Sequence, residues 1–178
     1  MPRPLRLADD CHRLEFDSRH GRLQRLVDRA GGYELITEPR LGENFRLLLP
    51  LPGRECNYIL GSEQLLTSYE LTPRRLTLFW QGPLAGAYGR FPLDVTLWIE
   101  LAEGAIRFRC RVRNRTRYAL TEVWFAMLGG LTGLGRTEAQ RRATEALVPT
   151  VNHQWQQRLF ADFGNTRGQT LGVPGGEH

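Results

Sequence analysis

The sequence predicts an all-β protein, an antiparallel β-sandwich with one short helix. Short segments of alternating apolar and polar residues recur from residue 12 to residue 130, helix-forming runs are scarce, and 19 glycines and 10 prolines interrupt the chain. Closely spaced strands separated by turn residues are typical of a sandwich. With 178 residues and 41% hydrophobic content, the chain can bury the core of a single domain.

Ten segments are expected to form strands, and residues that favour turns separate them. The turn SRHG follows the first segment, AGG precedes the third, and Glu103-Gly104 joins the eighth to the ninth. The last three segments are the longest and alternate most regularly. In order, the expected strands are 12–17, 22–29, 33–37, 45–52, 56–64, 65–72, 75–81, 92–102, 105–116 and 119–128.

The character of the chain changes after this strand-rich core. Residues 137–148 are expected to form the helix, with Thr137 as its N-cap, Gln140 as capping-box partner and Pro149 just beyond its end. Residues 150–178 are expected to hold one more strand, around 157–163, and then a tail rich in glycine and proline.

Composition argues against several classes of function. The net charge is +5 with no lysine, which is typical of a GC-rich genome and too small by itself to indicate nucleic-acid binding. Cys11, Cys56 and Cys110 form no CxxC pair, so they are expected to be buried thiols without a disulfide or a metal. No apolar run resembles a leader or a membrane span, and no cofactor motif is present, so a cytoplasmic protein without membrane contact or cofactor is expected.

The stretch RFRCRVRNRTRY (107–118) places an arginine at every second position. If Glu103-Gly104 is a two-residue hairpin turn, strand partners have numbers that sum to 207. Trp98 then lies opposite Arg109, and Asp94 opposite Arg113, while apolar residues meet on the other face. A shift of one residue would place charges against the core, so this register is strongly specified.

A second tight turn at Arg117-Tyr118 would extend the same pattern to the next strand. It sets Arg113 opposite Glu122 and Arg111 opposite Trp124. The arginines would then form the polar face of a three-stranded meander, interleaved with acidic residues and two tryptophans.

Three interpretations fit this face. It is a solvated surface with arginines stacked on tryptophans, a platform for a sugar ring, or a site for a polyanion. An indole flanked by arginine and carboxylate groups suits a pyranose. The candidate sugar-binding residues are Trp98, Trp124, Arg109 and Arg111, with Asp94 and Glu122 as acceptors for hydroxyl groups.

The order of several motifs resembles that of the galactose-mutarotase-like supersandwich superfamily. The chain has LEFD followed by GRLQRLVDRAGGYELI, then RCRVRNRT, then VWFAMLGGLTGLG followed by ALVPT, over most of residues 12–150. The resemblance implies a fold shared with aldose 1-epimerases and with accessory modules of glycoside-processing proteins. Complete domains of this kind are considerably longer than this chain, so it is expected to be either a sandwich of this kind or the N-terminal portion of one.

The resemblance does not extend to catalytic residues. Aldose 1-epimerases use a histidine acid and a glutamate base, and none of His12, His20, His153 and His178 matches their motifs. The expected function is therefore non-catalytic binding of a mono- or oligosaccharide. The alternatives are a fragment of an epimerase or glycoside-processing enzyme, and an interaction module that completes its sheet by forming a homodimer.

Overall fold

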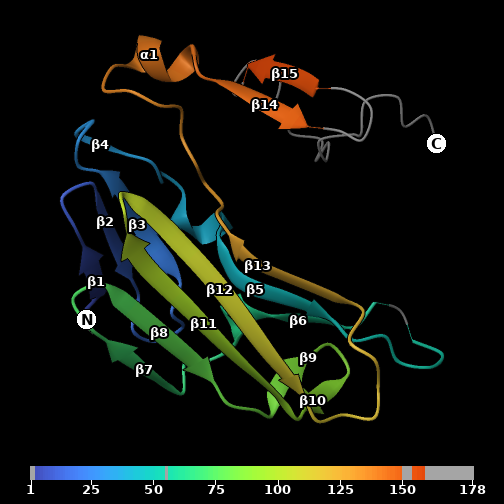
Figure 1. Ribbon diagram of the computed structural model, residues 1–178. Coiled ribbons are helices and arrows are strands. Elements are labelled where there is room, and N and C mark those ends of the chain that lie inside the picture. The colour runs from blue at the N-terminus through green and yellow to red at the C-terminus, as the bar shows by residue number, and fades with distance from the viewer. Residues whose placement is uncertain (1–2, 55, 150–153, 159–178) are drawn as a thin grey trace.

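The computed structural model describes residues 3–54, 56–149 and 154–158, and within them the protein is mostly β, with antiparallel sheets and one short α-helix (Figure 1). The helix α1 spans Glu138–Arg142, and short 3-10 turns lie at Pro39–Leu41 and Gly61–Glu63. None of the helices in this part of the chain has the length and hydropathy of a membrane span. The strands are β1 (Leu5–Ala8), β2 (His12–Phe16), β3 (Leu23–Asp28), β4 (Tyr33–Glu34), β5 (Glu43–Leu48), β6 (Tyr58–Leu60), β7 (Ser68–Leu71), β8 (Arg75–Trp80), β9 (Leu84–Gly86), β10 (Gly89–Phe91), β11 (Leu93–Ala102), β12 (Ala105–Asn114), β13 (Glu122–Met127), β14 (Glu145–Pro149) and β15 (Gln154–Arg158).

The ten strands predicted in the core all have a counterpart, and apart from β14, which was predicted as helix, the sequence prediction missed three short strands. The missed strands are β1, β9 and β10, each of three or four residues. Segments this short contain too few alternating positions for periodicity to be recognised.

The strands form three larger sheets and two small ones. Their orders are β1-β2-β3-β4, β12-β11-β8-β7, β13-β5-β6, β10-β9 and β14-β15. Every pair is antiparallel, so the predicted antiparallel all-β class is confirmed.

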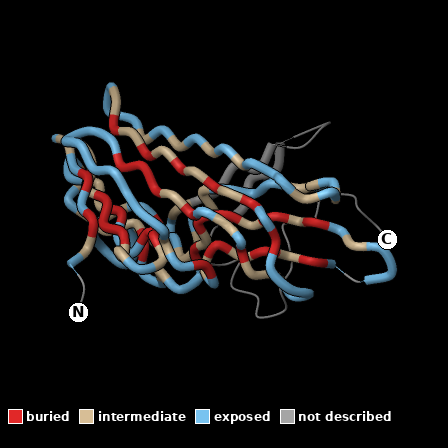
Figure 2. The backbone as a smooth tube through the Cα atoms, turned by 90° about the horizontal axis from the view of Figure 1, so that it is seen from below, coloured by how far each residue is buried: buried red, intermediate tan, exposed pale blue. Residues whose placement is uncertain are grey.

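One hydrophobic cluster connects the three larger sheets. Along β11 the residues Leu93, Val95, Leu97, Ile99 and Leu101 are buried, and the residues between them are only partly covered. Figure 2 shows this alternation of buried and less buried positions along the strands. The alternation means that the sheet containing β11 has one face in the core and one face toward solvent.

The β11–β12 hairpin has the predicted register. All ten partners sum to 207, from Ala102 opposite Ala105 to Leu93 opposite Asn114. Glu103 and Gly104 both adopt positive φ, 54° and 71°, as a two-residue turn of this kind requires. This part of the prediction is confirmed.

The predicted pairing of β12 with β13 is wrong. β13 pairs with β5, so that Phe125 lies opposite Phe45 and Trp124 opposite Arg46. Arg117-Tyr118 contains no residue that favours positive φ, and no tight turn forms there. The connection between β12 and β13 is instead a longer loop. At its start the Asn114 side chain accepts the Thr116 N–H at 2.9 Å, and at its end the Thr121 N–H donates to the Leu48 carbonyl at 3.0 Å, which directs the chain to β5.

The predicted helix begins correctly and ends too late. Thr137 and Gln140 form the capping box, with the Gln140 N–H donating to the Thr137 side chain at 3.2 Å. The helix stops at Arg142, and Glu145–Pro149, predicted as its second half, pairs with Gln154–Arg158 as an antiparallel hairpin. The strand expected around 157–163 thus lies partly in β15, and its remainder lies outside the described residues.

The three cysteines are free thiols in the structure. Cys11 and Cys110 are partly buried, but Cys56 is exposed, which corrects the prediction that all three are buried. Cys56 lies in the loop before β6, where its backbone is not part of a sheet.

Candidate functional site

The candidate site is the solvent side of the sheet β12-β11-β8-β7, which we call the arginine face. It carries alternate residues of three neighbouring strands, since alternate side chains share one face of a sheet. These residues are Arg107, Arg109, Arg111 and Arg113 of β12, Asp94, Thr96, Trp98 and Glu100 of β11, and Arg75, Thr77 and Phe79 of β8.

One hollow on the arginine face surrounds Trp98. The hollow has a volume of about 190 Å³. Trp98 is half-buried and lies between Arg109 on one neighbouring strand and Thr77 on the other. An apolar ring with cationic and anionic groups at its rim is an arrangement that binds a sugar ring. The hollow is lined by Arg75, Trp98, Glu100, Arg107 and Arg109.

A second hollow of about 500 Å³ lies toward the other end of the same strands, next to Asp94. Its polar rim includes Arg111, Arg113 and Arg115, and Phe79 adds an aromatic surface. Arg109 and Arg111 are adjacent positions on the same face of β12, so the two hollows are neighbours. The second hollow is lined by Phe79, Trp80, Gln81, Gly82, Asp94, Val95, Thr96, Arg111, Arg113 and Arg115.

The ion pairs of the arginine face leave several arginines without a carboxylate partner. Asp94 pairs with Arg115 at 2.7 Å, and Glu103 pairs with Arg107 at 2.7 Å. In the described part of the chain Arg109, Arg111 and Arg113 form no ion pair. Unpaired guanidinium groups on a sheet face make it cationic, and they keep their hydrogen-bond donors free for a ligand.

The arginines do not stack on the tryptophans as the solvated-surface interpretation supposes. The arginine–aromatic stacks among the described residues are Arg46 on Tyr58, Arg54 on Tyr88 and Arg117 on Tyr118, at 5.8, 5.5 and 5.1 Å from the ring centroids. Arg109 is the direct neighbour of Trp98, but its guanidinium is not stacked on the indole. Nothing in these stacks therefore covers the Trp98 ring.

The structure brings together four of the six predicted site residues and separates two. Trp98 and Arg109 share the first hollow, and Asp94 and Arg111 share the second. Trp124 and Glu122 lie on β13, in another sheet, where the Trp124 indole N–H donates to the Glu122 carboxylate at 2.9 Å. They were grouped with the arginines by the wrong β12–β13 register.

The sequence prediction did not include Arg75 and Phe79 in the site. Both come from β8, which pairs with β11 without a tight turn between the two strands. The alternation in RLTLFW assigns these residues to one face of a strand, but it does not identify the strand that lies beside it.

An acid–base pair for catalysis is not evident among the described residues. The carboxyl groups with displaced pKa values, those of Asp9, Asp28 and Glu138, are all displaced downward, whereas a general acid needs a raised pKa. At Asp28 the main cause is the hydrogen bond from the Gly31 N–H, and at Glu138 it is the hydrogen bond from Arg142. At Asp9 burial raises the pKa, but the hydrogen bonds from the N–H groups of residues 11 and 12 outweigh this effect, so the pKa is lowered overall.

No metal-binding group is assembled either in the residues that the structure describes. No three histidine, cysteine, aspartate or glutamate side chains gather there in a way that could hold an ion. The arginine face, with its indole and free guanidinium groups, is therefore the strongest candidate for a binding site. No protein-family model, curated protein or solved structure matches this chain.

Proposed function

We propose that this protein binds carbohydrate without altering it, and that its ligand carries carboxylate, sulfate or phosphate groups. The observation that carries the proposal is the hollow in which the half-buried Trp98 indole is bordered by Arg75, Arg107, Arg109 and Glu100. A sugar ring would stack on the indole, and its hydroxyl groups would donate to Glu100 and accept from the arginines.

The preference for an acidic ligand rests on the unpaired arginines. Arg109 borders the Trp98 hollow, and Arg111 and Arg113 border the neighbouring one. A neutral sugar would leave these three cations without a counter-charge, whereas an acidic group on the sugar or on the next residue of an oligosaccharide would form a charge-assisted hydrogen bond. Affinity for a monosaccharide is expected to be around millimolar, because few groups are engaged.

The motifs that resemble the mutarotase-like superfamily support the same function. We propose that the three larger antiparallel sheets belong to a sandwich of that type, since they share one core. Domains of that superfamily also occur as accessory, non-catalytic modules of glycoside-processing proteins. The enzyme-fragment alternative is less well supported, because no histidine of the described residues lines either hollow of the arginine face.

Protein-observed NMR of the indole N–H signals tests the proposal. The chain has four tryptophans, so each signal can be followed separately. Titration with galacturonate or glucuronate is expected to move the Trp98 signal saturably, and titration with galactose is expected to move it less. Trp98→Ala and Arg109→Ala are each expected to weaken the affinity for acidic sugars by about tenfold or more.

The matched control is Trp124→Ala, because Trp124 is 54% exposed but lies on another sheet. This variant should bind acidic sugars as the parent does. Carbohydrate binding is rejected if no saccharide moves the Trp98 signal. If inorganic phosphate or dextran sulfate moves signals of the arginine face and no monosaccharide does, the face is a general anion site.

A further inference from the structure

β12 forms a long and regular free edge. In the described part of the chain it is the terminal strand of its sheet, paired with β11 through ten residues without a bulge or a proline. Unpaired edges of this kind offer N–H and C=O groups to another strand, and proteins usually shorten, bend or cover them. In the described part of the chain the β12 edge is neither short, bent nor covered, and its only protection of this kind is the charge of its arginines.

The geometry of the hairpin identifies the backbone groups at this edge. In an antiparallel pair closed by a two-residue turn, the residues that flank the turn bond to each other, and every second pair repeats this arrangement. The bonded residues of β12 are therefore its odd-numbered arginines, in line with the Arg115 N–H donating to the Pro92 carbonyl at 3.0 Å. The N–H and C=O groups of Ile106, Phe108, Cys110 and Val112 consequently point outward.

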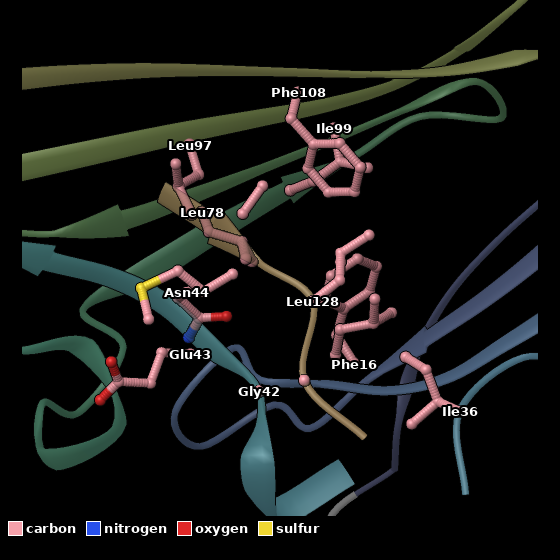
Figure 3. A pocket seen from close by; sticks show the side chains of 14 residues that line it. Phe16, Ile36, Gly42, Glu43, Asn44, Leu78, Leu97, Ile99, Phe108 and Leu128 are labelled. Atoms are coloured by element: carbon pink, nitrogen blue, oxygen red, sulfur yellow. The ribbon is translucent and has the colours of Figure 1, made fainter. Parts of the chain in front are cut away.

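The two sides of this edge differ in chemistry. On one side lie the unpaired guanidinium groups of Arg109, Arg111 and Arg113. On the other side lie half-buried apolar side chains, including Phe108, which lines a small cavity of about 20 Å³ with Leu97 and Leu128 (Figure 3). A strand added here would have one row of its side chains beside cations and the other row beside the core.

The core is also incompletely covered on β13, the terminal strand of the sheet β13-β5-β6. Val123 and Phe125 lie opposite the fully buried Leu47 and Phe45, so they belong to the core-facing side of their sheet, yet they are 43% and 40% exposed. Figure 3 shows Phe108 of β12 and Leu128, just after β13, around the same cavity. Apolar side chains of a strand added at β12 would therefore lie near Leu128 at this cavity.

We propose that the β12 edge docks an extended segment of a partner protein in which acidic and apolar residues alternate. The segment adds a strand to the sheet, its acidic residues facing the arginines and its apolar residues facing the core side. A second copy of this chain is a poorer occupant. Pairing of two β12 edges with both apolar sides toward the cores places arginines of both copies on one face, where like charges repel.

The test uses a capped ten-residue peptide of alternating glutamate and valine, at concentrations where it is monomeric. A peptide of alternating lysine and valine and a peptide with five glutamates followed by five valines are the controls. Only the first peptide is expected to bind. In hydrogen exchange, the amides of Phe108, Cys110 and Val112 should gain protection, while those of Arg109 and Arg111, already bonded to β11, should change little.

The protein variant is Arg109→Glu with Arg111→Glu, which is expected to weaken peptide binding by about tenfold or more at 150 mM salt. Its matched control is Arg19→Glu with Arg40→Glu, which changes the net charge equally at exposed positions outside the sheet of β12 and should alter affinity less than about twofold. Val112→Pro, which removes one outward donor at an edge position where proline is tolerated, should also weaken binding in a folded protein.

Three results would overturn the proposal. They are absence of binding by the glutamate–valine peptide to the parent protein, equal weakening by both double variants, and protection that does not alternate along β12. A stable dimer that protects the same outward amides without peptide would instead identify a second copy as the occupant. Trp98→Ala should leave peptide affinity unchanged within about twofold, which separates this proposal from carbohydrate binding.

Discussion

The carboxylate of Asp94 lies 2.7 Å from the guanidinium of Arg115, although Arg113 is its direct neighbour across the β11–β12 pair. The same Oδ1 atom accepts the Gly82 N–H at 3.0 Å. Asp94 is thereby held at the rim of the larger hollow. Among the residues that the structure describes, Arg113 has no carboxylate partner. The carboxylate reduces the positive potential of the hollow but does not neutralise it.

Asp94→Asn is expected to increase affinity for acidic sugars a few fold, because Arg115 then joins Arg111 and Arg113 as an uncompensated cation. The free energy of unfolding should fall by about 1 kcal/mol or less, since Arg115 is well exposed to solvent. Titration with galacturonate at low and physiological salt measures the change, which should shrink as salt increases.

Glu38→Gln is the control for this substitution, because Glu38 pairs with Arg40 outside the arginine face. It should leave sugar affinity unchanged. If Asp94→Asn weakens binding instead, the Asp94 carboxylate itself accepts a sugar hydroxyl group, as the sequence analysis expected.

The Glu103-Gly104 turn should tolerate substitution in a way that depends on φ. Gly104→Ala is expected to lower the free energy of unfolding by about 1 kcal/mol, because φ at this position is 71°. The added Cβ would lie 3.8 Å from the Cys11 sulfur, an ordinary contact, so the effect comes from the backbone alone. Urea denaturation of the parent and the variant measures it.

Glu103→Asn should have the opposite effect and raise the free energy of unfolding by several tenths of a kcal/mol, because asparagine tolerates positive φ better than glutamate. The lost ion pair with Arg107 contributes little at this exposed position. Equal stability of the parent, Gly104→Ala and Glu103→Asn proteins would show that the turn does not have this conformation.

The sequence predicted the β11–β12 register because all the information is local. A two-residue turn fixes the alignment, and ten successive pairs then agree on which face is apolar. The same reasoning failed at β13, where the partner strand β5 lies more than seventy residues earlier in the chain. Hydrophobic alternation in β13 fits β5 as well as β12, and only the missing turn residue at Arg117-Tyr118 distinguishes them.

The part of the candidate site that lies on the β11–β12 hairpin could be predicted from the sequence, and the part that lies on β8 could not. Trp98 and Arg109 come together because they are partners within it, and Asp94 and Arg111 occupy positions on the same face. Arg75 reaches the Trp98 hollow through the non-local β8–β11 pairing, which no feature of the sequence identifies. The early end of the helix at Arg142 was also missed, since residues 145–149 suit a helix as well as a strand until a partner strand is known.

Ala126 should tolerate glycine better than a larger residue. Its φ is 52°, unusual for a residue with a side chain, and it lies between the pairs Phe125–Phe45 and Met127–Glu43 of the β13–β5 ladder. Ala126→Gly is therefore expected to leave the free energy of unfolding unchanged or to raise it by up to about 1 kcal/mol. Ala126→Val should lower it by about 1–2 kcal/mol, because a β-branched residue is strained at positive φ.

Ala102→Gly is the control, since Ala102 lies at the end of a regular strand with ordinary φ. There glycine should lower the free energy of unfolding by about 0.5–1 kcal/mol. Equal destabilisation by glycine at both positions, measured by urea denaturation, would contradict the positive φ at Ala126.

Cys110 should react slowly with alkylating reagents, because burial raises the pKa of its thiol to about 11. Only the thiolate is nucleophilic, and at pH 8 a thiol with this pKa is ionised to about one part in a thousand, against about a quarter for an ordinary thiol with a pKa of about 8.5. Iodoacetamide at pH 8 is therefore expected to label the exposed Cys56 much faster than Cys110, as followed by peptide mass spectrometry.

The rate at Cys110 should rise about tenfold for each pH unit between 8 and 10, and unfolding in urea should remove the difference between the two cysteines. The unfolded chain loses the Cys110 proton at lower pH than the folded protein does. The associated stability is therefore complete below about pH 8 and decreases as the pH rises toward 11. Fast labelling of Cys110 at pH 8 would mean that the core side of β12 is open to solvent. If instead the glutamate–valine peptide slows labelling of Cys110 but not of Cys56, the added strand covers the core side of β12, as the docking proposal requires.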